Sequence, residues 1–451
     1  MVVKEFAEFA VAQRGAPLAD DVYNAATRAL VDWYAATLAG AGMQPARILR
    51  LALGISESRG SSTLIPDGVG VDARAAALIN GTASHTAELD DIFRDGIYHP
   101  GAPTVAAALA AAQRLQSSGE QLLRAIAVGY EISDRIAAAM QPAHYRYWHT
   151  TGTVGTIGAA AAVAELLGLD AEPFGHALAT ATTNAAGLLQ AFRSDSMSKP
   201  LHAGHAAEAG LIAAFAAEHG FTGALDILDG PAGFGTAMSD NPDWESALKV
   251  LGKPWAVTQA TVKNHSCCGH TFAAVDAALE LRAEGLTAST IDSIEIDAYT
   301  TATKVAGYAD PHSEFEAKFS LAYCVAAAFE LGSVRLAAFT PEKLADPTLR
   351  GLISRTTVAA DPEFDADFPG KRRARVTAHL ADGRSMTRVR NTRKGDPDDP
   401  LTDAELRSKF DDLAGPVIGA ESAAALSEAL WAMRGIADVR GALGGGKVGT
   451  A

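Results

Sequence analysis

Two patterns of apolar and polar positions divide the chain. Over most of its length, apolar side chains recur every three or four residues in Ala-rich stretches, which predicts amphipathic and buried helices. The helix expected over 119–140 is apolar almost all round, as a buried helix would be. We expect the other helices at 2–13, 18–38, 44–53, 71–87, 103–117, about 156–167, 170–189, from about His202 onward, 402–413 and 420–434.

The second pattern lies between residues 270 and 395. Residues 290–300 alternate Ile with acidic residues, which is typical of a half-buried strand, and residues 372–390 read as a hairpin that turns at Asp382 and Gly383. A helix is expected between them, over 314–331.

The two patterns predict how the chain is organised. A chain of 451 residues is longer than one core supports, so more than one domain is expected. The sequence predicts a mainly α fold: a large all-helical domain built from both chain ends, 1–269 and 396–440, with a smaller inserted α+β domain, 270–395. Residues 441–451 are expected to form a flexible tail.

The first of four polar segments, residues 80–104, carries Glu88, Asp90, Asp91 and His99. The proline after His99 disfavours helical backbone at that histidine. We therefore expect His99 on an ordered loop between two helices, a usual place for functional side chains. The alternative is a solvated loop with a few capping carboxylates.

The second and third polar segments each precede an Ala-rich helix. In residues 144–156, His149 and Thr150 come just before a helix whose free amides and dipole would favour an anion. Thr is also a good N-cap, so the alternative is that this pair only caps the helix. In residues 190–210, Lys199 precedes a proline, which predicts extended backbone and a cation placed for a carboxylate. The alternative is an ordinary surface lysine.

The fourth polar segment, residues 262–272, holds Lys263, Cys268 and His270. Cys and His are dense here, but the adjacent pair of cysteines matches no usual zinc spacing. We therefore expect no metal. The Gly-rich stretch 221–235 lacks the dinucleotide fingerprint, so no nucleotide cofactor is expected either.

Charge and composition narrow the possible partners. A net charge of −15 disfavours nucleic-acid binding, and an anionic substrate would require the few cations to gather in one place. Three cysteines without a pairing pattern fit a reducing cytoplasm. The N-terminus lacks the layout of a signal peptide and no apolar run reaches eighteen residues, so we expect a cytoplasmic protein without membrane contact.

Several motifs together resemble the MmgE/PrpD family, which includes 2-methylcitrate dehydratase, cis-aconitate decarboxylase and iminodisuccinate epimerase. They are HTAELDD, YHPGAP, GYEISDR, WHTTGTVGT, SKPLHAGHAAEAG, KNHSCCGHT and AKFSLAYC, and they follow the family's order. The resemblance implies that the inserted α+β domain is a lid domain, and that the protein is a homodimer with neither a metal nor an organic cofactor. It also implies an active site at Glu88, Asp90, Asp91, His99, His149, Lys199, Lys263, Cys268 and Tyr323.

The acidic, histidine and lysine side chains of these segments suit proton transfer at a carbon next to a carboxylate in a small di- or tricarboxylate. Proton carriers lie near scarce cations, and fixed positive charge stabilises the enolate-like state that forms. We expect His99 to transfer the proton, His149 to act as a second acid or base, Asp90 or Asp91 to orient His99, and Tyr323 to donate from the lid. Lys199 supplies charge, and the substrate is expected to contact Glu88, Thr150, Lys263, Cys268 and His270.

Three reactions fit such a site. Dehydration is placed first because the His and acid loop offers an acid for a leaving hydroxyl; decarboxylation and epimerisation are the alternatives. The chain departs from the decarboxylase-type motif at Glu88, Ile92 and Cys268, and these departures weaken the case for decarboxylation. A non-catalytic helical binding protein is the alternative from another class. A binding protein would be the better interpretation if His99, His149, Lys199 and Lys263 did not line one cleft.

Overall fold

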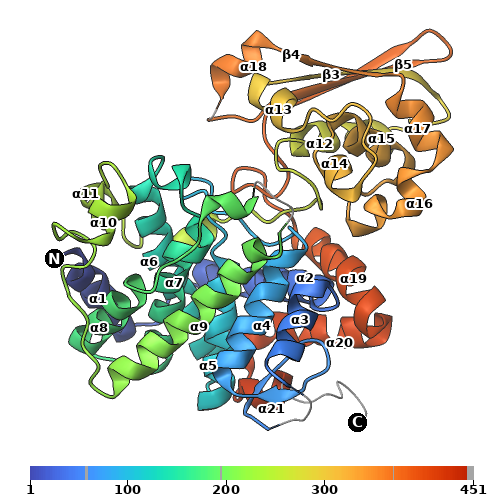
Figure 1. The fold of residues 1–451 in the computed structure, drawn as a ribbon. Coiled ribbons are helices and arrows are strands. Elements are labelled where there is room, and N and C mark those ends of the chain that lie inside the picture. The colour runs from blue at the N-terminus through green and yellow to red at the C-terminus, as the bar shows by residue number, and fades with distance from the viewer. Residues whose placement is uncertain (56–58, 193–195, 369, 444–451) are drawn as a thin grey trace. The chain divides into compact units, whose positions relative to one another are not determined.

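The computed structural model describes residues 1–55, 59–192, 196–368 and 370–443. The chain forms two compact units (Figure 1). Unit 1 is Met1–Val262 with Thr402–Ala451, and unit 2 is Lys263–Leu401. The sequence predicted the inserted domain over 270–395, so the predicted domain starts later and ends earlier than unit 2 does. The fold is mainly α with a small sheet portion, as predicted.

Five helices form the centre of unit 1 and pack side by side (Figure 1). They are α4 (Ala73–Thr86), α5 (Gly101–Leu115), α6 (Gly119–Met140), α7 (Thr150–Leu166) and α9 (Ser198–Glu218). Both α6 and α7 are buried along nearly their whole length, which confirms the prediction of a buried helix over 119–140. Their many Ala residues allow the helix axes to approach closely.

The remaining helices of unit 1 surround this centre. The chain's two ends meet there, because α19 and α20 pack against α2. None of the helices within the described ranges is both long and apolar enough to cross a bilayer. The surrounding helices are α1 (Val2–Ala12), α2 (Asp20–Ala41), α3 (Gln44–Ala52), α8 (Ala171–Thr182), α10 (Phe234–Met238), α11 (Trp244–Lys249), α19 (Asp403–Ile418), α20 (Ala420–Trp431) and α21 (Val439–Leu443).

Glycines set how closely α9 approaches its neighbours. A Cβ atom on Gly204 would lie 2.2 Å from both the carbonyl oxygen of Leu78 and the hydroxyl of Thr82 on α4. A Cβ atom on Gly210 would lie 2.5 Å from the carbonyl oxygen of Thr156 on α7. Both distances are shorter than atoms tolerate, so these two positions require glycine.

We predict that Gly204→Ala destabilises the protein because it forces α4 and α9 apart. Overpacking of this kind costs about 1–3 kcal/mol of the free energy of unfolding. The matched control is Gly415→Ala on α19, where an added Cβ meets nothing within 4 Å. Thermal unfolding of both variants tests the point: Gly204→Ala should melt below wild type and Gly415→Ala at or above it. Equal melting temperatures would contradict the proposed close packing.

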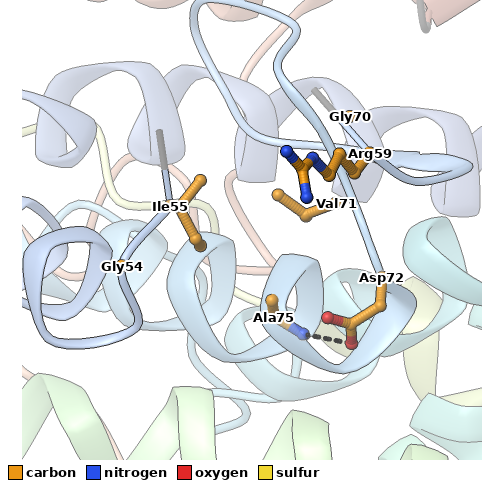
Figure 2. Close-up of a pocket in the computed structure, with 7 residues that line it drawn as sticks. All are labelled: Gly54, Ile55, Arg59, Gly70, Val71, Asp72 and Ala75. Carbon is orange, nitrogen blue, oxygen red and sulfur yellow. Dashed lines mark hydrogen bonds between the residues drawn. The ribbon is translucent and has the colours of Figure 1, made fainter. Parts of the chain in front are cut away.

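A surface pocket lies where α3 ends and α4 begins (Figure 2). Its volume is about 290 Å³. Asp72 in its wall already caps α4 by accepting the backbone N–H groups of Arg74 and Ala75. None of the predicted site residues lines it. The lining is Gly54, Ile55, Arg59, Gly70, Val71, Asp72 and Ala75.

Unit 2 is built on a four-stranded sheet in the order β4-β3-β5-β6. Strand β3 (Ile291–Ala298) pairs in parallel with β4 (Thr356–Ala360) and antiparallel with β5 (Ala374–Leu380), which pairs antiparallel with β6 (Ser385–Arg390). The structure confirms the predicted strand and the predicted hairpin. The turn carries Gly383 at φ +84°, a conformation that glycine adopts readily.

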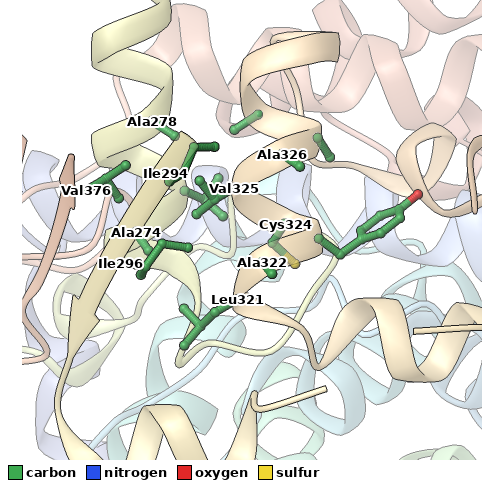
Figure 3. Packing of buried hydrophobic residues seen from close by; sticks show 14 of the residues in the cluster. Ala274, Ala278, Ile294, Ile296, Leu321, Ala322, Cys324, Val325, Ala326 and Val376 are labelled. Atoms are coloured by element: carbon green, nitrogen blue, oxygen red, sulfur yellow. The ribbon is translucent and has the colours of Figure 1, made fainter. Parts of the chain in front are cut away.

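Helices cover one face of this sheet and form the core of unit 2. Figure 3 shows Ile294 and Ile296 of β3 in one cluster with Ala278 of α12 and Val325 of α15. The helices of unit 2 are α12 (Phe272–Ala283), α13 (Thr300–Val305), α14 (Glu314–Lys318), α15 (Leu321–Leu331), α16 (Pro341–Leu344), α17 (Pro347–Ile353) and α18 (Pro362–Asp367).

Three predicted elements need correction. The helix expected over 170–189 ends at Thr182, and the chain beyond it forms a loop. The helix expected over 314–331 is two helices, because the side chain of Ser320 caps α15 by accepting the N–H of Tyr323. The predicted tail begins inside α21, so residues 441–443 are helical; residues 444–451 lie outside the described residues.

Candidate active site

Four histidine rings from three parts of unit 1 lie next to one another, and we call them the histidine cluster. His85 is in the last turn of α4, His99 is on the following loop, His149 is the N-cap of α7, and His202 is near the start of α9. The ring of His85 lies 4.9 Å from that of His99 and 5.3 Å from that of His149. The Nδ1 atoms of His149 and His202 are 3.0 Å apart.

Asp90 lies between two of these rings. One of its carboxylate oxygens is 2.6 Å from Nδ1 of His85 and 3.3 Å from Nδ1 of His99. Asp90 is buried, which opposes ionisation, but the charges and hydrogen bonds of His85 and His99 outweigh burial and hold the pKa of Asp90 well below its usual value. A buried carboxylate is therefore shared between two imidazoles.

Asp91 faces away from the histidines. It accepts hydrogen bonds from the Tyr130 hydroxyl at 2.8 Å and from the backbone N–H of Gly101 at 3.0 Å. Burial, followed by the nearby charge of Asp32, raises the pKa of Asp91 to about 7. Of the two carboxylates predicted as partners of His99, the structure therefore places Asp90 beside that ring, whereas Asp91 is held by Tyr130 and Gly101.

The raised pKa of Asp91 predicts a change in the pH dependence of stability. Between the ordinary carboxyl pKa and about 7, the folded protein keeps a proton that the unfolded chain loses, so the free energy of unfolding falls as pH rises and levels above pH 7. Between pH 5 and pH 8 this contribution amounts to roughly 2–3 kcal/mol, at about 1.4 kcal/mol per pH unit. Asp91→Asn should remove it.

Urea unfolding of wild type and Asp91→Asn at pH 5 and pH 8 measures this difference. Asp170→Asn, which removes an exposed carboxyl from the same unit, is the control and should behave as wild type does. An Asp91→Asn variant with the wild-type pH dependence would show that Asp91 is ionised in the folded protein at pH 5.

The start of α7 holds the backbone of His99. The N–H of His99 donates to the Thr151 hydroxyl at 3.2 Å, while the Thr150 hydroxyl accepts from the Gln141 side chain at 3.1 Å. Thr150 is buried, and its predicted contact with the substrate stays a prediction. The helix also begins at Thr150 rather than after it, with His149 as N-cap and no side-chain capping bond, so the prediction of a Thr cap is wrong.

Burial makes His149 and His202 neutral imidazoles at neutral pH. It lowers the pKa of His149 well below its usual value, and the positive charges of His85, Lys199, His202 and His99 act in the same direction. Burial likewise lowers the pKa of His202 to about 4. A neutral imidazole donates a hydrogen bond from one ring nitrogen and accepts one at the other. His149 and His202 can therefore form a hydrogen bond with each other through their Nδ1 atoms, and each keeps its second ring nitrogen for another partner.

Lys199 forms an ion pair with Glu88 beside the histidine cluster. Lys199 lies in the first turn of α9, so the extended backbone predicted from the following proline is wrong. A proline in the first helical turn costs no hydrogen bond, because the N–H groups there have no partner within the helix. The same polar segment contains a second cation, Arg193, which lies outside the described residues.

Glu88 adopts a strained backbone conformation, φ +59°, that non-glycine residues rarely take. The side chains of Glu88, Lys199 and His99 are 40%, 18% and 17% exposed, whereas those of His85, Asp90 and His149 are buried. A ligand from solvent would therefore meet this ion pair and His99 first.

One group of side chains within the described ranges has the spacing of metal ligands: His85, Asp90 and His99, whose ligand atoms lie within 4.8 Å of one another. Zinc would require all three atoms to converge at about 2.0–2.2 Å from one point. Here one Asp90 oxygen lies 2.6 Å from Nδ1 of His85 and 3.3 Å from Nδ1 of His99, so the three ligand atoms contact one another directly in this structure.

The other four predicted site residues belong to unit 2. Lys263 is buried. Burial raises the pKa of the Cys268 thiol to about 11, so it is not a thiolate at neutral pH. Burial lowers the pKa of His270 to about 4, and its Nδ1 lies 2.6 Å from the Tyr299 hydroxyl. Whether these side chains meet the histidine cluster stays a prediction.

Tyr323 is in the core of unit 2, and its role as a donor to substrate stays a prediction. It is fully buried, and its hydroxyl donates to the carbonyl oxygen of Ala338 at 2.6 Å. The ring also stacks on Phe339 with centroids 5.8 Å apart. These contacts use both the apolar face and the hydroxyl within unit 2.

Sequence reasoning missed four side chains that contact the predicted site residues. They are His85, Tyr130, Thr151 and His202. Two signals were present: His202 follows Lys199 by three residues, so both lie on one helix face, and His85 precedes Asp90 within the first polar segment. Tyr130 sits in an apolar helix and gives no such signal.

Comparison with known proteins finds one family along nearly the whole chain. The model of the MmgE/PrpD N-terminal domain matches residues 4–247, and that of the MmgE/PrpD C-terminal domain matches residues 265–433. The chain is 30% identical to the cis-aconitate decarboxylase-like protein oryM of Aspergillus oryzae, over 93% of this chain and 92% of that protein.

Two further relatives carry a related name. Human cis-aconitate decarboxylase is 29% identical over 91% of this chain and 88% of its own length. Cis-aconitate decarboxylase of Aspergillus terreus is 26% identical over 80% of this chain and 78% of its own length.

Proposed function

Because this chain belongs to the MmgE/PrpD family, we propose that the histidine cluster of unit 1 is the active site of a lyase for small di- or tricarboxylates. One observation carries the proposal: a single buried carboxylate, Asp90, contacts both His85 and His99, while Lys199 lies beside the same cluster. This combination supplies a proton carrier with a fixed partner and a cation for an anionic substrate.

In the proposed arrangement, Lys199 binds a substrate carboxylate in place of the Glu88 carboxylate that it holds in this structure. The incoming group offers the same charge and the same kind of oxygen acceptor, so the exchange leaves no buried charge unpaired.

His99 is proposed to move the proton. Its ring is the partly exposed member of the Asp90 pair, so it can reach both the substrate and the buried carboxylate. Asp90 orients the ring and stabilises its protonated form, and the hydrogen bond of Thr151 fixes its backbone. Neutral His149 serves as a hydrogen-bond donor or second base beside it.

Decarboxylation of an unsaturated tricarboxylate is the reaction we place first, because the relatives named above are called cis-aconitate decarboxylases or decarboxylase-like. The carbon–carbon bond to one carboxylate breaks, CO2 leaves, and the electron pair spreads over the double bond and a neighbouring carboxylate. A proton delivered by His99, and replaced from water, then closes the reaction at carbon. The sequence alone had placed dehydration ahead.

Dehydration of a hydroxy-tricarboxylate is the second candidate, and one feature favours it. The chain has Glu88 and Ile92 where the decarboxylase-type motif has Asp and Thr, and Glu88 is the side chain paired with Lys199. In this reaction His99 would take the proton from the neighbouring carbon and then pass it to the hydroxyl as the carbon–oxygen bond breaks, so that water leaves.

Proton and carbon NMR of substrate mixtures separates these reactions. Purified protein, treated with EDTA and dialysed, is incubated with cis-aconitate, 2-methylcitrate, citrate and an iminodisuccinate source in separate samples. We expect CO2 loss from the first or water loss from the second, without added metal. No change in any sample, or activity only after a metal is returned, would contradict the proposal.

A further inference from the structure

A lysine from the C-terminal part of unit 1 contacts the loop that carries the active-site carboxylates. Lys409 lies on α19, and its side chain is fully buried. Its ammonium group donates to Asp32 on α2 at 2.5 Å and to the backbone carbonyl oxygen of Leu89 at 2.8 Å. The second contact joins residues 320 positions apart in the sequence.

The carbonyl of Leu89 occupies a special place in the loop. Leu89 separates Glu88, which holds Lys199, from Asp90, which contacts His85 and His99. A peptide unit is planar, so its carbonyl oxygen and the following N–H move together. An ammonium group that anchors the Leu89 oxygen therefore fixes the peptide plane that leads into Asp90.

Charge balance explains why a lysine can sit at this buried position. Burying an ammonium group costs several kcal/mol unless an anion and further hydrogen bonds accompany it. Asp32 supplies the anion and Leu89 supplies a carbonyl acceptor, both within hydrogen-bond distance. The contact also connects the loop to α2 and α19, two helices from opposite ends of the chain.

We propose that Lys409 is a positioning residue for the site: by holding the Leu89 carbonyl, it sets the backbone from which Asp90 reaches His85 and His99. Lys409 contacts neither histidine and is not expected to touch the substrate. The inference rests on the proposed function where turnover is concerned, but the contact with the loop is tested without turnover as well.

The test uses a variant that removes both buried charges, Asp32→Asn with Lys409→Met, because Lys409→Met alone leaves Asp32 buried without its lysine. The matched control is Arg124→Met. Arg124 also pairs with a buried acid in unit 1, Glu165, and donates to the Ala16 carbonyl. Glu165 keeps Arg14 as a partner in that control.

Two readouts are compared. The first is kcat and KM: we expect kcat of the double variant to fall about 100-fold with KM little changed, since small misplacement of a catalytic group has effects of this size. The second is the NMR spectrum of ¹³C-labelled histidine, assigned with His85→Gln and His99→Gln. The resonances of both histidines should shift in the double variant and stay in place in Arg124→Met.

Unchanged kcat with a lowered melting temperature would overturn the proposal, because Lys409 would then only stabilise the fold. Loss of kcat without movement of the two histidine resonances would overturn it as well. If wild type turns over no carboxylate, the proposed function has failed, and the resonances alone decide: shifts support the positioning role of Lys409, and their absence refutes it.

Discussion

His99→Gln is expected to lower kcat by roughly 10²–10⁴-fold, the usual contribution of one general acid or base. Glutamine keeps a polar side chain of similar reach but cannot carry a proton to carbon. Its amide can still donate to Asp90, so that buried carboxylate keeps a partner. His99 is on a loop and partly exposed, so the melting temperature should change little.

The control for His99→Gln is His219→Gln at the end of α9, where the side chain is 80% exposed. That variant should keep wild-type kcat and KM. If His99→Gln kept its activity, the proton would be moved by another group. If it melted as low as a core truncation does, His99 would be structural.

Lys199→Met is expected to lower kcat/KM by about 10–100-fold, which corresponds to the 1.5–3 kcal/mol of a charge-assisted hydrogen bond. The methionine keeps most of the aliphatic volume but removes the charge that meets the substrate carboxylate. Much of the loss should appear in KM, because the same charge binds substrate before the reaction. Glu88 is partly exposed, so its carboxylate can be hydrated once its partner is gone.

Lys249→Met, at the end of α11 in the same unit, is the matched control. It removes one positive charge from the surface without touching the histidine cluster. A Lys199→Met variant whose kcat/KM equals that of Lys249→Met would show that Lys199 does not bind the substrate, and the ion pair with Glu88 would then be only a surface contact.

Local periodicity was sufficient to predict the elements whose burial is regular. The helix over 119–140 and the hairpin around Gly383 have the expected bounds, because their apolar positions repeat with the period of the element. Strand β4 (Thr356–Ala360) gave no such signal. It is an edge strand whose residues are mostly exposed and small, so its existence depends on pairing with β3 rather than on its own pattern.

The composition of the site could be predicted only in part. Proline and glycine marked the loop of His99, and scarce cations drew attention to Lys199. The sharing of Asp90 by two histidines depends on helix ends that meet in three dimensions, and sequence spacing does not give that distance. The burial of Tyr323 depends likewise on the packing of α15 against the rest of unit 2.

The central claim is that His99 carries a proton between solvent and a substrate carbon. Its most direct test is turnover in D2O by EDTA-treated protein, with the product examined by NMR. The account predicts one deuterium at the reacting carbon when wild type releases CO2, and loss of this product in His99→Gln. Product formed by His99→Gln at the wild-type rate, with deuterium at the same carbon, would contradict it.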